Sequence, residues 1–180
     1  MFKLVRLLTL FAFFTSCGSD NVLYVPLSDE EASLPYYSEE EEIVSHTAYT
    51  LSYSEEHEQA LWVAYTLTSE QASSDMERTD DYREDPAIAN GSASLSDYSG
   101  SGYDRGHLAP AGDMEWDHTA MSESFFLSNM SPQLAGFNRY IWKDLEADVR
   151  DAAKTNGKIH IVTGPVFGDG YPVLDTIGEN

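Results

Sequence analysis

Residues 103–111 read Tyr-Asp-Arg-Gly-His-Leu-Ala-Pro-Ala, and they hold the densest group of chemically useful side chains in the sequence. His107 is the side chain best suited to move a proton near neutral pH. A lone histidine is more often structural or merely exposed. Here two charged residues, Asp104 and Arg105, precede it closely in the sequence, which is unusual for a structural histidine. The stretch therefore indicates a candidate general base.

A helix is predicted over residues 138–154, because apolar side chains recur there at helical spacing. These side chains are Ile141, Trp142, Leu145, Val149 and Ala152. Asn138 at the start offers a neutral oxygen ligand suited to Mg²⁺, and it is also a favoured N-cap residue. Glu146 lies about 80° around and about 12 Å along the helix from Asn138. A salt bridge to Lys143 or Arg150 is the structural alternative for Glu146.

Missing motifs exclude several other enzyme classes. The sequence contains neither HExxH nor a cysteine cluster, so a zinc hydrolase is not expected. It also lacks GxSxG, a P-loop and a Rossmann glycine pattern.

Strand patterns surround these motifs and indicate an α+β fold. Residues 46–53 and 60–67 are rich in aromatic and hydroxyl β-formers and predict an antiparallel hairpin. Residues 125–127 and 159–167 predict two further strands. Residues 68–102 are polar and predict a long surface loop, which is usually functional or wrapped over the core.

The N-terminal region is predicted to contain a targeting signal followed by a linker. Residues 1–17 have a basic start, an apolar run and Cys17 at the expected cleavage point, like a bacterial lipoprotein signal. An ordinary signal peptide is the alternative. The signal predicts a lipoprotein of the bacterial outer membrane or periplasm, anchored through a lipid on Cys17, or a secreted protein. Residues 18–43 predict an acidic linker, and residues 44–180 predict the folded domain.

The charge of the chain excludes a basic DNA-reading module. Ten Lys and Arg stand against 31 Asp and Glu, a formal net charge of −21, whereas such modules are basic. Within residues 104–180, five of six basic residues lie between Arg139 and Lys158, which predicts a less negative path for phosphate near Asn138.

Four blocks resemble the DNA/RNA non-specific endonuclease family, which includes secreted bacterial nucleases and mitochondrial endonuclease G. In order, they are residues 103–111, Ser-Asn-Met-Ser-Pro-Gln at 128–133, Phe-Asn-Arg at 137–139 with Trp142 and Leu-Glu at 145–146, and Val-Thr-Gly-Pro-Val-Phe at 162–167. The resemblance covers roughly residues 43–180. It implies a central antiparallel sheet with packed helices and a ββα-metal active site.

The resemblance also implies roles for the catalytic and metal-binding residues. His107 would be the general base that deprotonates the attacking water. Asn138 would be the direct protein ligand of one Mg²⁺, for which Mn²⁺ is a substitute. Glu146 would hold the waters of that ion.

Supporting roles follow from the same resemblance. Arg78 matches the arginine that stabilises charge on the phosphate, with Arg83 as its rival. Arg105 would support the phosphate site or the local loop. Asn129 would fix that loop and the orientation of the histidine, and Asp104 is expected to be structural.

The implied activity is Mg²⁺-dependent hydrolysis of DNA and RNA that leaves 5′-phosphate ends, with a homodimer as a further implied assembly. Family members normally continue beyond the Gly-Pro-Val-Phe strand, so the chain is expected to lack the C-terminal part of the domain. One alternative function is a non-catalytic acidic surface lipoprotein that uses the fold as a binding scaffold. Another is a related phosphodiesterase acting on small nucleotides.

Overall fold

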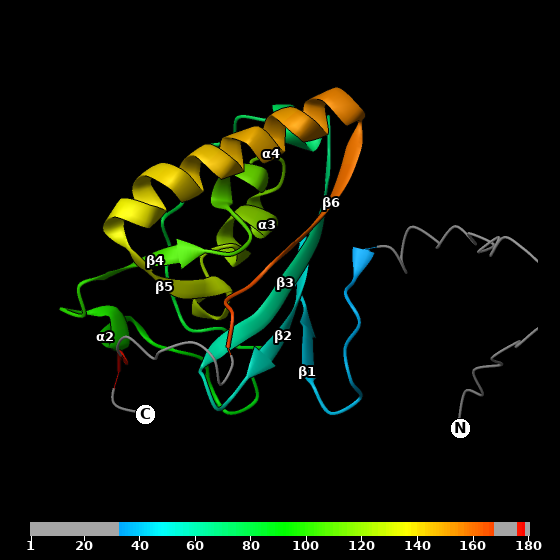
Figure 1. The fold of residues 1–180 in the computed structure, drawn as a ribbon. Coiled ribbons are helices and arrows are strands. Elements are labelled where there is room, and N and C mark those ends of the chain that lie inside the picture. Colours follow the sequence, from blue (N-terminus) through cyan, green and yellow to red (C-terminus); the bar gives the residue numbers. More distant parts are fainter. Residues whose placement is uncertain (1–32, 168–175, 179–180) are drawn as a thin grey trace, which may run out of the picture.

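The computed structural model describes residues 33–167 and 176–178, which form an α+β fold with two antiparallel sheets (Figure 1). This architecture confirms the predicted fold class. The predicted signal segment with Cys17, and linker residues 18–32, lie outside the described residues.

The main sheet has four strands in the order β1-β2-β3-β6, each antiparallel to its neighbour. The strands are β1 Glu42–Ser45, β2 Tyr49–Ser54, β3 Gln59–Thr68 and β6 Lys158–Thr163. The predicted hairpin is therefore confirmed as β2 and β3. The inner strand β3 is buried on both faces, with Val63 and Ala64 at 0% and 2% exposure, so it lies at the centre of the core.

The second sheet pairs β4 Tyr103–His107 with β5 Met130–Leu134. A π-helix, η4 Phe137–Trp142, follows β5 and continues directly into α4 Lys143–Asn156. The remaining elements are η1 Gln71–Ser73, α2 Leu95–Tyr98, η2 Ala111–Asp113, α3 His118–Glu123 and η3 Leu127–Asn129. Figure 1 shows α3, α4 and the β4–β5 pair on one side of the main sheet. The β4–β5–helix succession agrees with the ββα arrangement expected from the sequence.

Strands β4 and β5 were not predicted from the sequence, and one predicted strand is wrong. Polar and small residues dominate residues 103–107 and 130–134, which hides the strand pattern there. Residues 125–127 do not form a strand. Phe126 makes only an isolated bridge to Arg83, and its phenyl ring packs against His46 instead.

The predicted apolar face of the long helix is partly wrong. Ile141 and Leu145 are 67% and 48% exposed, whereas Ala153 is fully buried. Ile141 lies within the π-helix of residues 137–142, whose turn holds more residues than an α-helical turn, so α-helical spacing does not place it. Trp142, Val149 and Ala152 of the predicted face are partly buried. Leu145, in the regular part of α4, is exposed, and Glu146 is partly buried beside it.

A buried carboxylate fastens α4 to the sheet. Asp113 has 0% exposure and accepts hydrogen bonds from Tyr65 Oη at 2.7 Å and from Arg150 Nη1 at 2.8 Å. Tyr65 lies on β3 and Arg150 on α4, so the Asp113 group connects three elements. Burial raises the pKa of Asp113, and the hydrogen bonds from Arg150 and Tyr65 oppose that rise.

The long connection between β3 and β4 wraps over the core rather than standing in solvent. Its Asp85 is buried and accepts hydrogen bonds from Ser128 Oγ at 2.6 Å and from the amide of Ala87 at 2.9 Å. His46 Nε2 lies 2.9 Å from the same carboxylate. Burial of Ile88 at 4% exposure adds an apolar anchor.

One glycine at the end of β6 is required by close packing. A Cβ on Gly164 would overlap with the backbone oxygen of Leu61 and lie 3.2 Å from Cα of Trp62. A backbone atom cannot move aside as a flexible side chain can. Gly164→Ala should therefore lower the free energy of unfolding by about 1–3 kcal/mol, measured by urea denaturation. Gly136→Ala is the control, since Gly136 has a helical φ of −68° and nothing lies within 4 Å of its Cβ position. Equal stability of the two variants would contradict the packing argument.

Candidate active site

His107 is the last residue of β4, and its imidazole is buried between aromatic rings. It is 7% exposed, with its ring centroid 5.1 Å from Phe125 and 5.8 Å from Tyr82 in edge-to-face geometry. Trp142 Nε1 donates to its backbone oxygen at 3.0 Å, which ties the end of β4 to η4. Nε2 of His107 is buried and has no hydrogen-bond partner among the described residues. A buried nitrogen without a hydrogen-bond partner lowers the stability of the fold. Its presence in a folded protein is therefore a sign of a catalytic or binding role.

The surroundings keep this imidazole neutral. Burial, together with the positive charges of Arg78 and Arg105, lowers the pKa of His107 to about 3, although Asp80 opposes the shift. At neutral pH the ring is therefore an unprotonated base with a free lone pair, rather than a proton donor.

The structure separates the two rival arginines. Arg78 lies with its Cζ 4.6 Å from the centre of the Phe125 ring, the same ring that packs against His107. Arg83 turns elsewhere, and its guanidinium donates to Asp81 and to both the backbone and the hydroxyl oxygen of Ser122. Arg78 is consequently the arginine that lies beside the histidine, and Arg83 is engaged in holding α3.

Arg105 also borders the site. Its Cζ is 4.1 Å from the centre of the Tyr82 ring, a cation–π arrangement. Tyr82 was not predicted from the sequence, where its one signal is an aromatic residue among charged ones. Its hydroxyl accepts a hydrogen bond from Arg78 Nη2 at 3.2 Å, so one ring contacts both arginines and the histidine.

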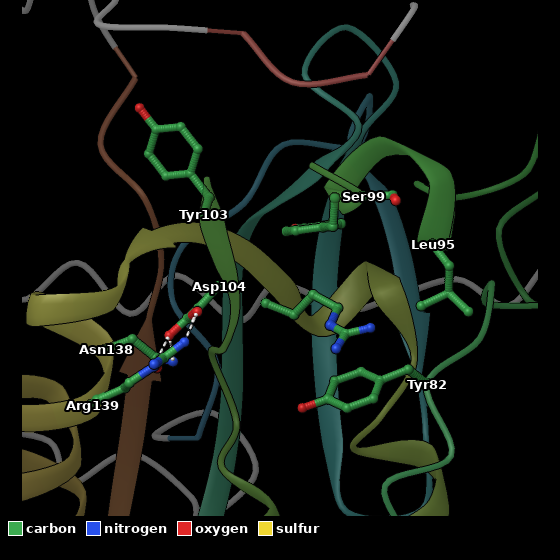
Figure 2. A pocket seen from close by; sticks show the side chains of 9 residues that line it. Tyr82, Leu95, Ser99, Tyr103, Asp104, Asn138 and Arg139 are labelled. Carbon is green, nitrogen blue, oxygen red and sulfur yellow. Dashed lines mark hydrogen bonds and ion pairs between the residues drawn. The ribbon is translucent and has the colours of Figure 1, made fainter. Parts of the chain in front are cut away.

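Asp104 joins β4 to the π-helix (Figure 2). Its carboxylate accepts hydrogen bonds from Asn138 Nδ2 at 3.0 Å and from Arg139 Nε and Nη2 at 2.8 and 2.7 Å. These contacts, with Arg139 foremost, hold the pKa of Asp104 below its ordinary value. The expectation of a structural Asp104 agrees with this geometry.

Asn138 does not cap the helix. Gly136 occupies the N-cap position of η4, so the N-cap alternative for Asn138 is wrong. Because Nδ2 is held by Asp104, the carbonyl oxygen Oδ1 is the atom of this side chain that remains to bind a cation.

Glu146 lies one turn before Arg150 on α4 and is only half exposed. The alternative for Glu146, a salt bridge to Arg150 or Lys143, does not form. Arg150 is paired with Asp113, and Glu146 has no ion pair within the described part of the chain. Burial raises the pKa of Glu146 to about 7, with Arg150 opposing and Asp113 assisting the shift. A nearby cation would strongly stabilise the ionised form of a carboxylate whose pKa is raised by burial.

Asn129 binds the backbone of the segment that follows His107. It is fully buried, its Oδ1 accepts from the amide of Ala109 at 2.9 Å, and its Nδ2 donates to the backbone oxygens of Ala109 and Ser124 at 2.9 and 2.8 Å. These contacts hold the segment directly after His107 and occupy both hydrogens of Nδ2.

Known proteins with sequences like this one are nucleases. Nuclease C1 of Cunninghamella echinulata var. echinulata is 43% identical over 110 residues, which cover 56% of this chain and 44% of that protein. Human mitochondrial endonuclease G is 36% identical over 148 residues, covering 77% of this chain and 50% of that protein. A crystal structure of an EndoG/EndoGI complex aligns with a TM-score of 0.68 and 36% identity, covering 76% of this chain and 60% of that one.

The sequence model of the DNA/RNA non-specific endonuclease family matches residues 33–180. The chain therefore belongs to the DNA/RNA non-specific endonuclease family, and the resemblance seen in the sequence is confirmed. The chain spans about half the length of the curated relatives it matches.

The relatives contradict the predicted bacterial lipoprotein or secreted location. Endonuclease G of human and cattle and the related nucleases of Schizosaccharomyces pombe and Saccharomyces cerevisiae are mitochondrial. A basic start followed by a short apolar run is shared by several kinds of targeting segment, so it could not specify the compartment by itself. None of the helices within residues 33–167 is both long and apolar enough to cross a membrane.

The lowered pKa of His107 predicts how the free energy of unfolding changes with pH. In the unfolded chain a histidine protonates near pH 6.5, whereas the folded state resists protonation until about pH 3. The unfolded state then binds more protons, so stability should fall as the pH drops from about 6.5 to 3, by up to roughly 1.4 kcal/mol per pH unit from this group. Histidine NMR titration should show a neutral His107 ring at pH 5. A midpoint above pH 6 would overturn the burial argument.

Proposed function

We propose that this chain is a Mg²⁺-dependent endonuclease that hydrolyses phosphodiester bonds of both DNA and RNA. The observation that carries the proposal is the buried, neutral His107 with an unpaired Nε2, placed beside Arg78 and Arg105. Family membership supports the same activity.

His107 is the general base in this proposal. Its Nε2 accepts a proton from the water that attacks the phosphorus, a contribution typically worth about 10²–10⁴-fold in rate. A pKa near 3 is low for this task, but two of its causes are the charges of Arg78 and Arg105. A bound phosphate neutralises those charges, so the substrate itself raises the basicity of the ring.

The two arginines attract and stabilise the phosphate. Attack by water adds negative charge to the phosphate oxygens, and fixed cations in a site that excludes water stabilise such charge effectively. Arg78 is held in place by Asp80 and Tyr82. Arg105, which lies over the Tyr82 ring, adds to the positive potential. The chain is otherwise strongly acidic, so this local potential matters for binding.

Two residues of the η4–α4 segment fit Mg²⁺. Asn138 offers an amide oxygen and Glu146 a carboxylate, and Mg²⁺ prefers oxygen ligands while keeping several waters. Within residues 33–167 and 176–178, no three His, Cys, Asp or Glu side chains are grouped as they would be for an all-protein metal cage. We propose that Asn138 binds the ion directly and that Glu146 holds its waters, with Mn²⁺ as a substitute. The bound ion would supply stabilisation of charge on the phosphate and on the leaving oxygen.

We propose that the products carry 5′-phosphate ends, as in the family. Contacts confined to phosphate and sugar carry no sequence information, which agrees with cleavage of both nucleic acids. A homodimer stays a prediction.

Digestion of plasmid DNA and of RNA with Mg²⁺ tests the proposal. Native chain should cleave both, EDTA should stop cleavage, and Mn²⁺ should restore it. His107→Ala should lose at least about 100-fold in rate, whereas His118→Ala, at an exposed position on α3, should cleave normally.

Other outcomes would identify the alternatives. No metal-dependent cleavage by a folded sample would favour a binding scaffold, and turnover of dinucleotides alone would favour a small-nucleotide phosphodiesterase. Undiminished activity in His107→Ala would exclude the assigned base.

The Asp104 contact provides a separate test of the metal ligand. Asp104→Asn removes the charge that orients Asn138, and loss of such a supporting partner typically weakens metal binding by about 10- to 100-fold. The Mg²⁺ concentration for half-maximal cleavage should rise accordingly. Asp144→Asn removes one charge from an exposed position of α4 and should leave that concentration unchanged. Equal responses of the two variants would contradict a directing role for Asp104.

A further inference from the structure

Three consecutive backbone carbonyls, those of residues 107–109, each accept a hydrogen bond from a side chain of a different element. The donors are Trp142 on η4, Thr163 at the end of β6 and Asn129 on η3. Thr163 Oγ1 donates to the oxygen of Leu108 at 2.9 Å. Of these three donors, only Thr163 belongs to the main sheet.

The ring of His107 depends on this backbone for its orientation. No described residue forms a hydrogen bond with Nε2, the atom proposed to take the proton. Edge-to-face packing with Tyr82 and Phe125 surrounds the ring, but such packing constrains direction less tightly than a hydrogen bond does. The position of Nε2 therefore follows the backbone at His107, and a shift of about 1 Å in a reacting group can cost roughly 100-fold in rate.

Thr163 fixes that backbone relative to the main sheet. His107 ends β4, which pairs with β5 to form the second sheet. Asn129 directly precedes β5 and so belongs to the same unit as His107. Thr163 instead pairs with the fully buried Val63 of β3. The end of β6 is held firmly there, because the next residue, Gly164, lies against the backbone of β3.

The main sheet also determines the position of Glu146. Tyr65 on β3 and Arg150 on α4 both bind Asp113, so α4 and its Glu146 are fastened to this sheet. The proposed base lies on the second sheet, whereas the carboxylate proposed to hold the metal-bound waters is fixed to the first. A hydrogen bond between the sheets at the residue after His107 therefore sets the base relative to Glu146.

We infer that Thr163 is a positioning residue for His107, because its hydroxyl fixes the peptide that follows the proposed base and thereby the direction of the ring. The inference rests on the proposed function for its link to catalysis, but the placement of the ring is measurable without cleavage. The sheets stay joined without this bond, since Ser131 Oγ on β5 also donates to Gln59 Oε1 on β3 at 2.8 Å. Loss of the Thr163 hydroxyl should therefore disturb the site locally and leave the fold intact.

The test compares variants that differ in one hydroxyl. Thr163→Val keeps the shape of the side chain and removes the donor, whereas Thr163→Ser keeps the donor. Thr66→Val is the matched control, because Thr66 on β3 also uses its hydroxyl within the main sheet, with Oγ1 2.8 Å from Nδ1 of His160. NMR signals of the His107 ring, recorded in EDTA, should shift in Thr163→Val and keep their native positions in Thr163→Ser and Thr66→Val.

Cleavage of an oligonucleotide with Mg²⁺ gives the second measurement. Thr163→Val should lower kcat by about tenfold and leave KM nearly unchanged, because the base is displaced while the arginines that bind the phosphate stay in place. Thr163→Ser and Thr66→Val should retain the native kcat. Circular dichroism at the assay temperature verifies that each variant is folded, and Thr163→Ala replaces Thr163→Val if the latter does not fold.

The outcomes separate this inference from the proposed function. An active native chain whose Thr163→Val variant keeps the native kcat or the native His107 signals would overturn the positioning role. Equal losses in Thr163→Val and Thr163→Ser, or in Thr163→Val and Thr66→Val, would do the same. Shifted His107 signals in Thr163→Val, together with no cleavage by the native chain, would overturn the proposed function and leave the placement of the ring by Thr163 standing.

Discussion

The buried carboxylate of Asp113 is the constraint on which the site geometry depends. A charge without water is tolerated only when it is paired and hydrogen-bonded, and Asp113 satisfies this condition through Tyr65 on β3 and Arg150 on α4. Loss of either partner would leave the carboxylate unsatisfied. The helix is thereby held at one position on the sheet, and Glu146, one turn before Arg150, is carried to its half-buried place.

A second carboxylate fixes the other end of the same helix. Asp104 binds Asn138 and Arg139 from β4, and neighbouring residues of a strand point to opposite faces. Asp104 consequently faces the π-helix, whereas Arg105 and His107 face Tyr82. One five-residue strand in this way supplies both the contact that orients the proposed metal ligand and the proposed base.

The sequence predicted the β2–β3 hairpin, the long helix and the residues gathered around His107, because hydrophobic alternation and a dense polar motif are local signals. It missed β4 and β5, since strands built from Asp, Arg, Gly, Ser and Gln owe their pairing to tertiary context rather than to propensity. Placement of Ile141 failed because a periodicity argument assumes an unbroken α-helix, whereas Ile141 lies in a π-helix. Tyr82 could not be found because its importance arises from three contacts with residues distant in the chain.

The π-helix at residues 137–142 makes the length of this segment matter more than its composition. Tyr140 and Ile141 are 70% and 67% exposed, so their identity is weakly constrained by packing. Deleting one of them would convert the wide turn into a regular α-helix and rotate Asn138 by about 100° relative to Glu146. An insertion or deletion here would therefore separate the two proposed oxygen ligands, Asn138 and Glu146, even if both residues were kept.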